Sequence, residues 1–255
     1  MKKIIYFFLE RKIIKESNIL TYTNKYLKEI YQKKFPSFSN KMTVLVNPIE
    51  VTEIENELIN QKKLPLEKIR FCYTGTLTRE RNLDPVLEYL KKNNIKKFEL
   101  FIIGGFGTLS YSAILGLKLS SFIIKCKRKR IEKKIRSYGY EESIKFLPFM
   151  SRKDLAKYIK EEIDVLINID ANLGDKNIFL SSKVIDYISY RKPILNFSNK
   201  GASTDFLKDF GINYYISYNE ENKEPKEYSQ LIPDLKQIKQ YENTEIIKSL
   251  LKIGE

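Results

Sequence analysis

Short apolar runs alternate with amphipathic segments from Lys68 onward. Two of the runs, FELFII and DVLINI, are almost continuously apolar, as expected for strands that are covered on both faces. The intervening segments carry apolar residues at i, i+3 and i+4, the spacing of amphipathic helices. Strands are therefore predicted at residues 69–74, 98–104, 144–148, 164–170, 193–197 and 213–217, and helices at 82–92, 152–162, 183–190 and 204–210. This alternation predicts a doubly wound, Rossmann-like α/β domain around a parallel sheet.

Composition supports a globular chain with one main domain. The 255 residues are 42% hydrophobic and 13% aromatic, which suffices for one large core or two small ones. No Gly/Ser linker or low-complexity tract separates independent modules. We predict the main domain over residues 68–225, a linker over 51–67 and C-terminal helices over 226–255.

The cysteines and the first residues bear on the compartment. The apolar run in MKKIIYFFLERK stops at Glu10, Arg11 and Lys12, too early for the apolar region of a signal peptide. Cys72 and Cys126 are the only cysteines and provide no disulfide framework. These features predict a cytoplasmic protein.

The charge balance favours an anionic partner. The chain has 46 Lys and Arg against 32 Asp and Glu, a formal net charge of +14, which attracts nucleotides, nucleic acids or lipid headgroups alike. A lysine bias of an Ile-, Lys- and Asn-rich chain is the alternative explanation. The basic residues form no RRM-like, KH-like or helix-turn-helix signature, so we expect no nucleic-acid partner.

The residues after the first predicted strand are candidates for binding, because ligands of parallel sheets bind at the carboxyl ends of the strands. Gly75 and Thr76 follow this strand, and Arg79 and Arg81 come before the next helix. A glycine turn with two cations ahead of a helix suits a diphosphate.

The second predicted strand ends in two further glycines. Gly104 and Gly105 let the backbone approach a ligand closely, although Ser110 breaks the G-x-G-x-x-G pattern. Glycines after a parallel strand more often only make the turn, and this alternative stays open for each of them.

A third candidate segment begins the predicted helix 183–190. Ser182 and Lys183 place free amides, a hydroxyl and an ammonium where they can converge on phosphate oxygens. Asp186 lies one turn on, where its carboxylate could accept both hydroxyls of a ribose. The alternative is that Ser181 only caps the helix and that Asp186 lies on its solvated face.

Taken in order, these segments resemble the donor-nucleotide domain of GT-B fold glycosyltransferases, in the large retaining family called group 1 or family 4. YTGTLTRERNLDPVLEYL is similar to the strand, glycine turn and helix that open this C-terminal domain, and FELFIIGGFG to its second strand. IKFLPFMSRKDLAKYIKEEIDVLINI is similar to the segment with the base-contacting loop, and FLSSKVIDYISYRKPIL to a variant P-S-K-x-x-E-Y-x-x-x-x-K-P block. The resemblance runs collinearly from Glu10 to Phe210.

The resemblance implies a role for each candidate. Arg81 would face the diphosphate, Lys183 would neutralise the leaving phosphate and Asp186 would face the ribose. Phe149 and Met150 would lie at the edge of the base.

The chain also departs from the family pattern at two positions. Thr76 stands where the family usually has its first phosphate-binding arginine, a role that Arg79 could take over. Ile178 stands where the first acid of the E-x7-E pattern would fall.

The implied activity is retaining hexosyl transfer from a nucleoside-diphosphate sugar to an envelope or surface glycan or a lipid-linked acceptor. Arg81, Lys183 and helix amides would stabilise the charge that develops on the β-phosphate. We expect no cofactor and no metal, since no D-x-D triplet or His/Cys cluster occurs. The alternative function is a catalytically inactive, nucleotide-sugar-binding fragment or the partner subunit of a split glycosyltransferase.

The first fifty residues resemble another part of the same family. SNILTYTNKYLKEIYQKKF and MTVLVNPIE are similar to the last helix and strand of its N-terminal acceptor domain. We therefore interpret residues 1–50 as a remnant of that domain, most of which is expected to be missing from this chain. A second chain that supplies the acceptor domain is an expected partner.

A largely apolar stretch over residues 109–124 is followed by KCKRKR. Its sixteen residues, interrupted by Lys118, fall short of the roughly 20 that a transmembrane helix needs. An interfacial helix with an adjoining basic cluster predicts peripheral binding to an anionic membrane surface, on the inner face of the membrane. The alternative is a core helix that continues as a solvated basic helix.

Overall fold

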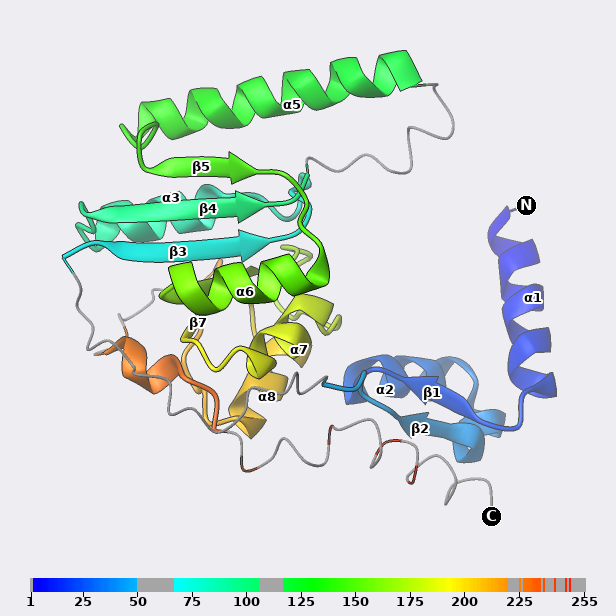
Figure 1. Ribbon diagram of the computed structural model, residues 1–255. Coiled ribbons are helices and arrows are strands. Elements are labelled where there is room, and N and C mark those ends of the chain that lie inside the picture. Colours follow the sequence, from blue (N-terminus) through cyan, green and yellow to red (C-terminus); the bar gives the residue numbers. More distant parts are fainter. Residues whose placement is uncertain are drawn as a thin grey trace.

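A central parallel sheet organises the larger part of the molecule (Figure 1). The computed structural model describes residues 2–49, 67–105, 117–219 and 227–234, together with positions 225, 236, 241, 246 and 248. The sheet has the strand order β5-β4-β3-β6-β7, with every neighbouring pair parallel. Its strands are β3 (Ile69–Thr74), β4 (Phe98–Ile103), β5 (Ile144–Leu147), β6 (Val165–Ile169) and β7 (Ile194–Phe197).

The strand order creates a switch point between β3 and β6. Within this sheet, β3 is the first strand and lies in the centre. The chain then adds β4 and β5 on one side of β3, and returns to add β6 and β7 on the other side. In such sheets the loops on either side of the switch point diverge and leave a crevice at the carboxyl ends of the strands. The topology confirms the predicted Rossmann-like, doubly wound class.

Helices cover both faces of this sheet. Tyr89 of α3 packs edge-on against Phe197, with ring centroids 5.7 Å apart, and Tyr158 of α6 packs in the same way against Phe101, at 5.8 Å. The register places Phe101 and Phe197 on opposite faces, so α3 and α6 lie on opposite sides, as Figure 1 shows. The helices are α3 (Asp84–Lys92), α5 (Leu117–Ser137), α6 (Arg152–Glu162), α7 (Ser182–Ser189) and α8 (Ala202–Asp209).

One predicted strand is wrong. Residues 213–217 do not form a strand; only Ile216 forms an isolated parallel bridge with Phe197. The Ile216 N–H donates to the Asn196 carbonyl at 2.8 Å, but the Tyr218 N–H then donates to the Asn199 side chain at 3.0 Å. The backbone therefore leaves β7 after one bridge, because a side-chain acceptor replaces the next carbonyl of the ladder.

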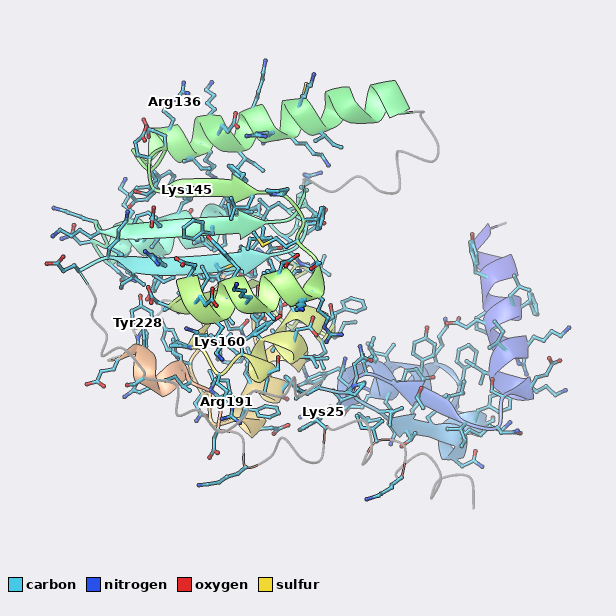
Figure 2. The ribbon with its side chains drawn as sticks, in the orientation of Figure 1. Lys25, Arg136, Lys145, Lys160, Arg191 and Tyr228 are labelled. Carbon is cyan, nitrogen blue, oxygen red and sulfur yellow. The ribbon has the colours of Figure 1, made fainter. Side chains whose placement is uncertain are left out.

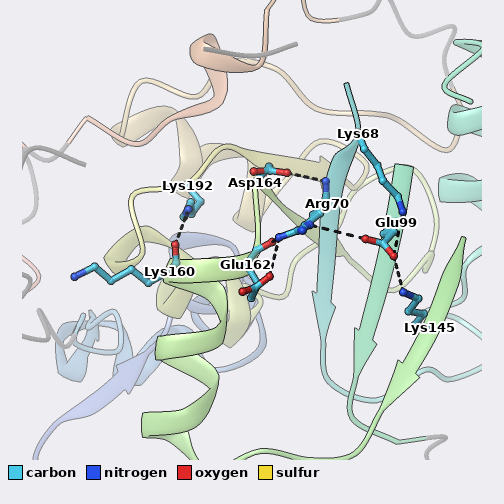
Figure 3. A network of polar contacts seen from close by, with 8 residues as sticks. All are labelled: Lys68, Arg70, Glu99, Lys145, Lys160, Glu162, Asp164 and Lys192. Carbon is cyan, nitrogen blue, oxygen red and sulfur yellow. Dashed lines mark hydrogen bonds and ion pairs between the residues drawn. The ribbon is translucent and has the colours of Figure 1, made fainter. Parts of the chain in front are cut away.

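Ion pairs join the strands at the amino-terminal edge of the sheet, opposite the switch-point loops (Figure 3). The Glu99 carboxylate on β4 pairs with Lys145 on β5 at 2.5 Å and with Lys68 at 3.2 Å. Arg70 on β3 reaches Glu162 at 2.7 Å, and its backbone N–H donates to Asp164 at 2.8 Å. Glu99 thus connects three neighbouring strand starts.

A small α/β unit precedes the main sheet. It contains α1 (Lys2–Glu16), β1 (Leu20–Tyr22), α2 (Lys25–Lys34), the 3-10 helix η1 (Pro36–Lys41) and β2 (Met42–Val44), with β1 and β2 parallel. Its buried centre consists of Ile14, Phe35 and Met42. The Asn24 side chain caps α2 by accepting from the N–H groups of Tyr26 and Leu27.

This unit contacts the main domain through α8. The Lys25 ammonium lies 2.7 Å from the Asp205 carboxylate, and the Tyr26 hydroxyl donates to Asp205 at 2.5 Å; Figure 2 shows Lys25 at the junction. The origin of residues 1–50 in an acceptor domain stays a prediction. The predicted linker lies outside the described residues except at Glu67, and the described part of the C-terminal segment contains the 3-10 helix η2 (Tyr228–Leu231).

Helix α5 lies beyond the edge strand β5 (Figure 1). Ile135 is buried against the core, and Lys134 pairs with Asp84 of α3 at 2.5 Å. Cations spaced along the outer side of the helix are exposed, namely Lys125, Lys129, Arg130, Lys133 and Arg136. Residues 109–116 of the predicted apolar stretch lie outside the described residues, and residues 117–124 form the start of α5. Among the helices that are described, none is long and apolar enough to span a membrane.

Candidate functional site

The turn after β3 packs directly against the start of α7. Gly75 has φ +118°, and its N–H donates to the Ile103 carbonyl at 2.8 Å. A Cβ atom at this position would lie 2.1 Å from Cε and 2.9 Å from Nζ of Lys183. Only glycine therefore combines this backbone conformation with the close approach of the lysine side chain.

A second glycine turn, after β4, stacks on the first. Gly104 has φ +140°, and a Cβ there would lie 2.3 Å from the Gly75 carbonyl oxygen. A Cβ at Gly105 would lie 3.2 Å from the ring of Phe149, which is 72% exposed. Gly104 thus serves backbone packing, as the alternative for these glycines stated, whereas Gly75 faces a charged side chain. Phe149 stands exposed beside the two turns.

Arg81 and Lys183 bring two positive charges to this crevice. Within the described part of the chain, Nε of Arg81 is buried and has no hydrogen-bond partner. Burial and, to a smaller extent, the nearby charge of Arg81 lower the pKa of Lys183 to about 8, although Asp170 and Asp186 oppose the shift. The Lys183 ammonium also lies 5.3 Å from the ring centroid of Tyr73. An unsatisfied guanidinium nitrogen beside a desolvated ammonium indicates a site for an anion.

The loop that carries Arg81 is shaped by its own hydrogen bonds. The Arg81 N–H donates to the Thr78 hydroxyl at 3.1 Å, and the Thr78 N–H donates to the Arg81 carbonyl at 2.9 Å. Thr76 is partly buried, and its carbonyl accepts from the Tyr73 hydroxyl at 3.2 Å. Arg79 lies exposed in the same loop.

Helix α7 presents its first residues to the crevice. Ser182 and Asp186 are exposed, and Lys183 is partly buried between the two loops. Ser181 occupies the N-cap position, but its side chain makes no capping hydrogen bond; its hydroxyl donates instead to Asn168 at 3.1 Å. The alternative is therefore wrong about a capping side chain at Ser181, whereas Asp186 is exposed as that alternative stated.

Behind the helix start, α7 is anchored to the sheet by a buried tyrosine. The Tyr187 hydroxyl accepts the backbone N–H of Thr74 at 2.9 Å and lies 2.9 Å from the Thr74 hydroxyl. Thr74 immediately precedes Gly75, so this contact fixes the helix relative to the glycine turn.

Sequence reasoning missed a buried polar cluster beneath the site. Asp170, directly after β6, is 1% exposed and accepts hydrogen bonds from Asn168, Asn177 and Ser198. The signal was present in the polar positions of VLINID and ILNF, where apolar residues would be expected in buried strands. Met150, by contrast, is partly buried against the core. In the ranges that the structure describes, no group of three or more His, Cys, Asp and Glu side chains is placed to hold a metal.

Comparison with known proteins agrees with this arrangement. Residues 54–169 match the model of the family described as "Glycosyl transferases group 1", a range that ends before Lys183 and Asp186. A search of curated proteins by sequence gives no match.

Solved structures with the same fold include three sugar-transfer proteins. A lipopolysaccharide outer core galactosyltransferase, WaaB, has a TM-score of 0.60 at 12% identity over 93% of this chain and 61% of its own. The UDP-forming α,α-trehalose-phosphate synthase of Burkholderia vietnamiensis has 0.62 at 8% identity over 95% and 60%. Anabaena HepE, solved in complex with UDP and glucose, has 0.50 at 13% identity over 90% and 55%.

These structures show a similar fold over most of the chain. The chain spans between 55% and 61% of the length of these three proteins. They share the GT-B glycosyltransferase fold with this chain. Residues 54–169 of this chain thus match the glycosyl transferases group 1 family model, and the chain has the C-terminal-domain fold of GT-B glycosyltransferases.

Proposed function

We propose that this chain binds a nucleoside-diphosphate sugar in the crevice between β3 and β6 and supplies the donor half of a glycosyltransferase. The observation that carries the proposal is the pairing of Arg81 and Lys183 around the Gly75 turn, with one buried guanidinium nitrogen unsatisfied. Two cations in a partly desolvated site favour an anionic ligand, and a diphosphate carries more than one negative charge. The complex of HepE with UDP and glucose supports UDP as the first ligand to test.

In this proposal, different residues around the turn bind different parts of the nucleotide. Arg81 and Lys183 bind the diphosphate, with Arg79, Ser182 and the first amides of α7 at its edge. Asp186, exposed one turn along α7, accepts the ribose hydroxyls. Phe149 offers an exposed aromatic face to the base, with Met150 beneath the same loop, while Gly75, Thr76, Gly104 and Gly105 supply the backbone floor.

The same cations would promote sugar transfer with retention of configuration. Negative charge develops on the β-phosphate as the bond to the hexose breaks, and fixed cations stabilise that charge without reorganising. Because Arg81 and Lys183 would supply this positive charge, we propose that transfer needs no metal or other cofactor. The acceptor in this proposal is an envelope or surface glycan or a lipid-linked sugar.

Exposed cations on α5 favour a lipid-linked acceptor. Its exposed lysines and arginines would attract anionic headgroups, and each such cation contributes about 1 kcal/mol to binding near a charged surface. We propose that the protein acts in the cytoplasm, on the inner face of a membrane, with α5 against the lipid.

A second candidate function is that of a nucleotide-sugar-binding partner subunit without activity of its own. Its support is an exposed apolar seam on α1: Tyr6, Leu9 and Ile13 recur at i, i+3 and i+7 and are between 53% and 68% exposed. Phe7 and Ile14 lie on the face that packs against Phe35 and the rest of the small unit. A second chain that supplies an acceptor domain would cover the exposed seam.

Thermal-shift measurements with nucleoside diphosphates and their sugars test the proposal. A ligand that binds only the folded state raises the melting temperature in proportion to affinity and concentration, so UDP should stabilise even an inactive chain. The Arg81→Ala/Lys183→Ala variant should keep its circular dichroism spectrum and lose the shift, because each charge-assisted contact contributes about 1.5–3 kcal/mol.

A matched control removes the same charges elsewhere. Lys133→Ala/Arg136→Ala takes one lysine and one arginine from the exposed side of α5 and should retain the shift. A full shift in the Arg81→Ala/Lys183→Ala variant would place the diphosphate elsewhere. Transfer of sugar by the isolated chain would exclude the inactive-subunit function.

A further inference from the structure

The buried Asp170 carboxylate is held by neutral donors on both of its oxygens. Asn168 donates to Oδ1 at 3.1 Å, while Asn177 and Ser198 donate to Oδ2 at 2.8 and 2.9 Å. At 1% exposure the group has almost no contact with water. The hydrogen bonds to this buried carboxylate thus come from amide and hydroxyl dipoles rather than from a cation.

The same network reaches the first residues of α7. Asn168 donates to the Asn196 side chain at 2.7 Å and accepts from the Ser181 hydroxyl at 3.1 Å. Ser181 precedes Ser182 and Lys183, so the Asp170 cluster connects the ends of β6 and β7 to the start of the helix that carries the lysine. The position of Lys183 over the Gly75 turn therefore depends on this buried cluster.

Backbone contacts connect Asp170 to the loop of the other cation. Asn172, two residues after Asp170, donates its N–H to the carbonyl of Glu80, next to Arg81, at 2.9 Å. The Tyr218 hydroxyl also donates a hydrogen bond to the Asp170 carbonyl, at 2.7 Å. The segment at Asp170 is thus connected to the loop that carries Arg81 and to the start of the helix that carries Lys183.

Three charged groups and one aromatic ring face Lys183, each from a different segment of the chain. Arg81 opposes its protonation, and Asp170 and Asp186 favour it, while the Tyr73 ring lies beneath the ammonium. Asp186 is exposed on α7 itself, where water screens it, whereas Asp170 is buried and screened much less. Asp170 is therefore the anion best placed to balance the two cations.

We propose that Asp170 is a positioning residue that keeps the Arg81 and Lys183 pair in place and doubly charged for an anionic ligand. Without the buried anion, the two cations would repel each other in a partly desolvated site and Lys183 would release its proton at lower pH. The ligand would then meet one cation instead of two. The inference rests on the proposed function, in which this pair binds a diphosphate.

Asp170→Asn tests the proposal through the proton affinity of Lys183. Competitive acetylation of the protein across a pH series, followed by mass spectrometry of the Lys183 peptide, reports that affinity without any nucleotide. We expect the acetylation midpoint to fall by about one pH unit or more, as for the loss of a nearby opposite charge. A merely structural role would lower the melting temperature and leave the midpoint unchanged.

A second neutral variant covers the case in which Asp170→Asn does not fold. In Asp170→Asn/Asn177→Ala the new amide no longer faces the Asn177 donor, and Asn177→Ala alone is the control that keeps the charge. The midpoint should fall in the double variant and stay at the wild-type value in the control. An unchanged midpoint in a folded neutral variant would overturn the proposal.

Calorimetric titration with UDP separates this inference from the proposed function. Affinity in the wild type should decline as the pH rises past the Lys183 midpoint, and the decline should begin at lower pH in the neutral variants. Absence of UDP binding to the wild-type chain would contradict the proposed function, while the acetylation experiment would still decide the role of Asp170.

Discussion

Replacing Gly75 with alanine should separate the stability of the chain from its ability to bind a nucleotide. The new Cβ would lie 2.1 Å from Cε of Lys183, which is far inside van der Waals contact. The flexible end of the lysine must therefore move away from the crevice. Two effects follow, one on the backbone and one on the ammonium.

The backbone effect arises because φ of +118° at position 75 is unfavourable for alanine. Strain of this kind costs about 1–3 kcal/mol, and each kcal/mol lowers the melting temperature of a chain of this size by about 2–4 °C. The ammonium effect is the loss of one charge-assisted contact of about 1.5–3 kcal/mol. Affinity for a nucleoside diphosphate should consequently fall by about 10- to 150-fold.

Gly174→Ala is the matched control for this variant. Gly174 has φ +113°, and a Cβ there would meet nothing within 4 Å, so the conformational strain is similar but no cation moves. Isothermal titration calorimetry with UDP should show wild-type affinity for Gly174→Ala and the predicted loss for Gly75→Ala. Both variants should melt below the wild type.

A double-mutant cycle gives the decisive result. In a Lys183→Ala background the added methyl group has no ammonium to displace, so Gly75→Ala should cost little further affinity. The reasoning is refuted if Gly75→Ala binds UDP as well as Gly174→Ala does, or if its effect is the same with and without Lys183.

Three further predictions concern other parts of the molecule. Asp186→Asn should weaken binding of a ribonucleoside diphosphate more than that of its dideoxy analogue in calorimetric titrations, and equal losses would indicate a structural role. Changing Lys125, Lys127, Arg128, Lys129 and Arg130 to glutamine should abolish sedimentation with anionic vesicles at low salt; a wild-type chain that ignores such vesicles would contradict the membrane proposal. The hydrogen bond from Lys145 lowers the pKa of Glu99 below 4.5 although burial opposes it, so the stabilisation by Glu99 is complete above this pH and is lost as the pH falls through the lowered pKa. Denaturant unfolding should therefore show Glu99→Gln costing more stability at pH 7 than at pH 3, and equal costs would argue against the ion pairs.

Local patterns in the sequence were sufficient to predict most individual elements. Helix α6 has the predicted bounds, because its apolar spacing begins immediately after Ser151, whose side chain caps it by accepting from the Asp154 N–H at 3.2 Å. Strand β3 also has its predicted bounds, and β4 ends one residue early at Ile103. In these cases the residues that decide the element lie within a few positions of one another.

The placement of Gly75, Arg81 and Lys183 at one crevice depends on more than local pattern. Their position after strands and at helix starts was visible in the sequence and suggested a phosphate site. Periodicity, however, carries no information about which strand neighbours which. The order β5-β4-β3-β6-β7 brings the loop after β3 against α7, more than a hundred residues later.

Long-range contacts also decided what sequence reasoning missed. Asp170 receives one hydrogen bond from Ser198, 28 residues away, and the edge segment at Ile216 leaves the sheet because the Asn199 side chain captures the next N–H. The sequence by itself determined which faces are apolar and the approximate positions of most elements, since amphipathic spacing and capping depend on nearby residues. The tertiary structure decided which polar groups meet, because hydrogen bonds and charges act between atoms that only the fold brings together.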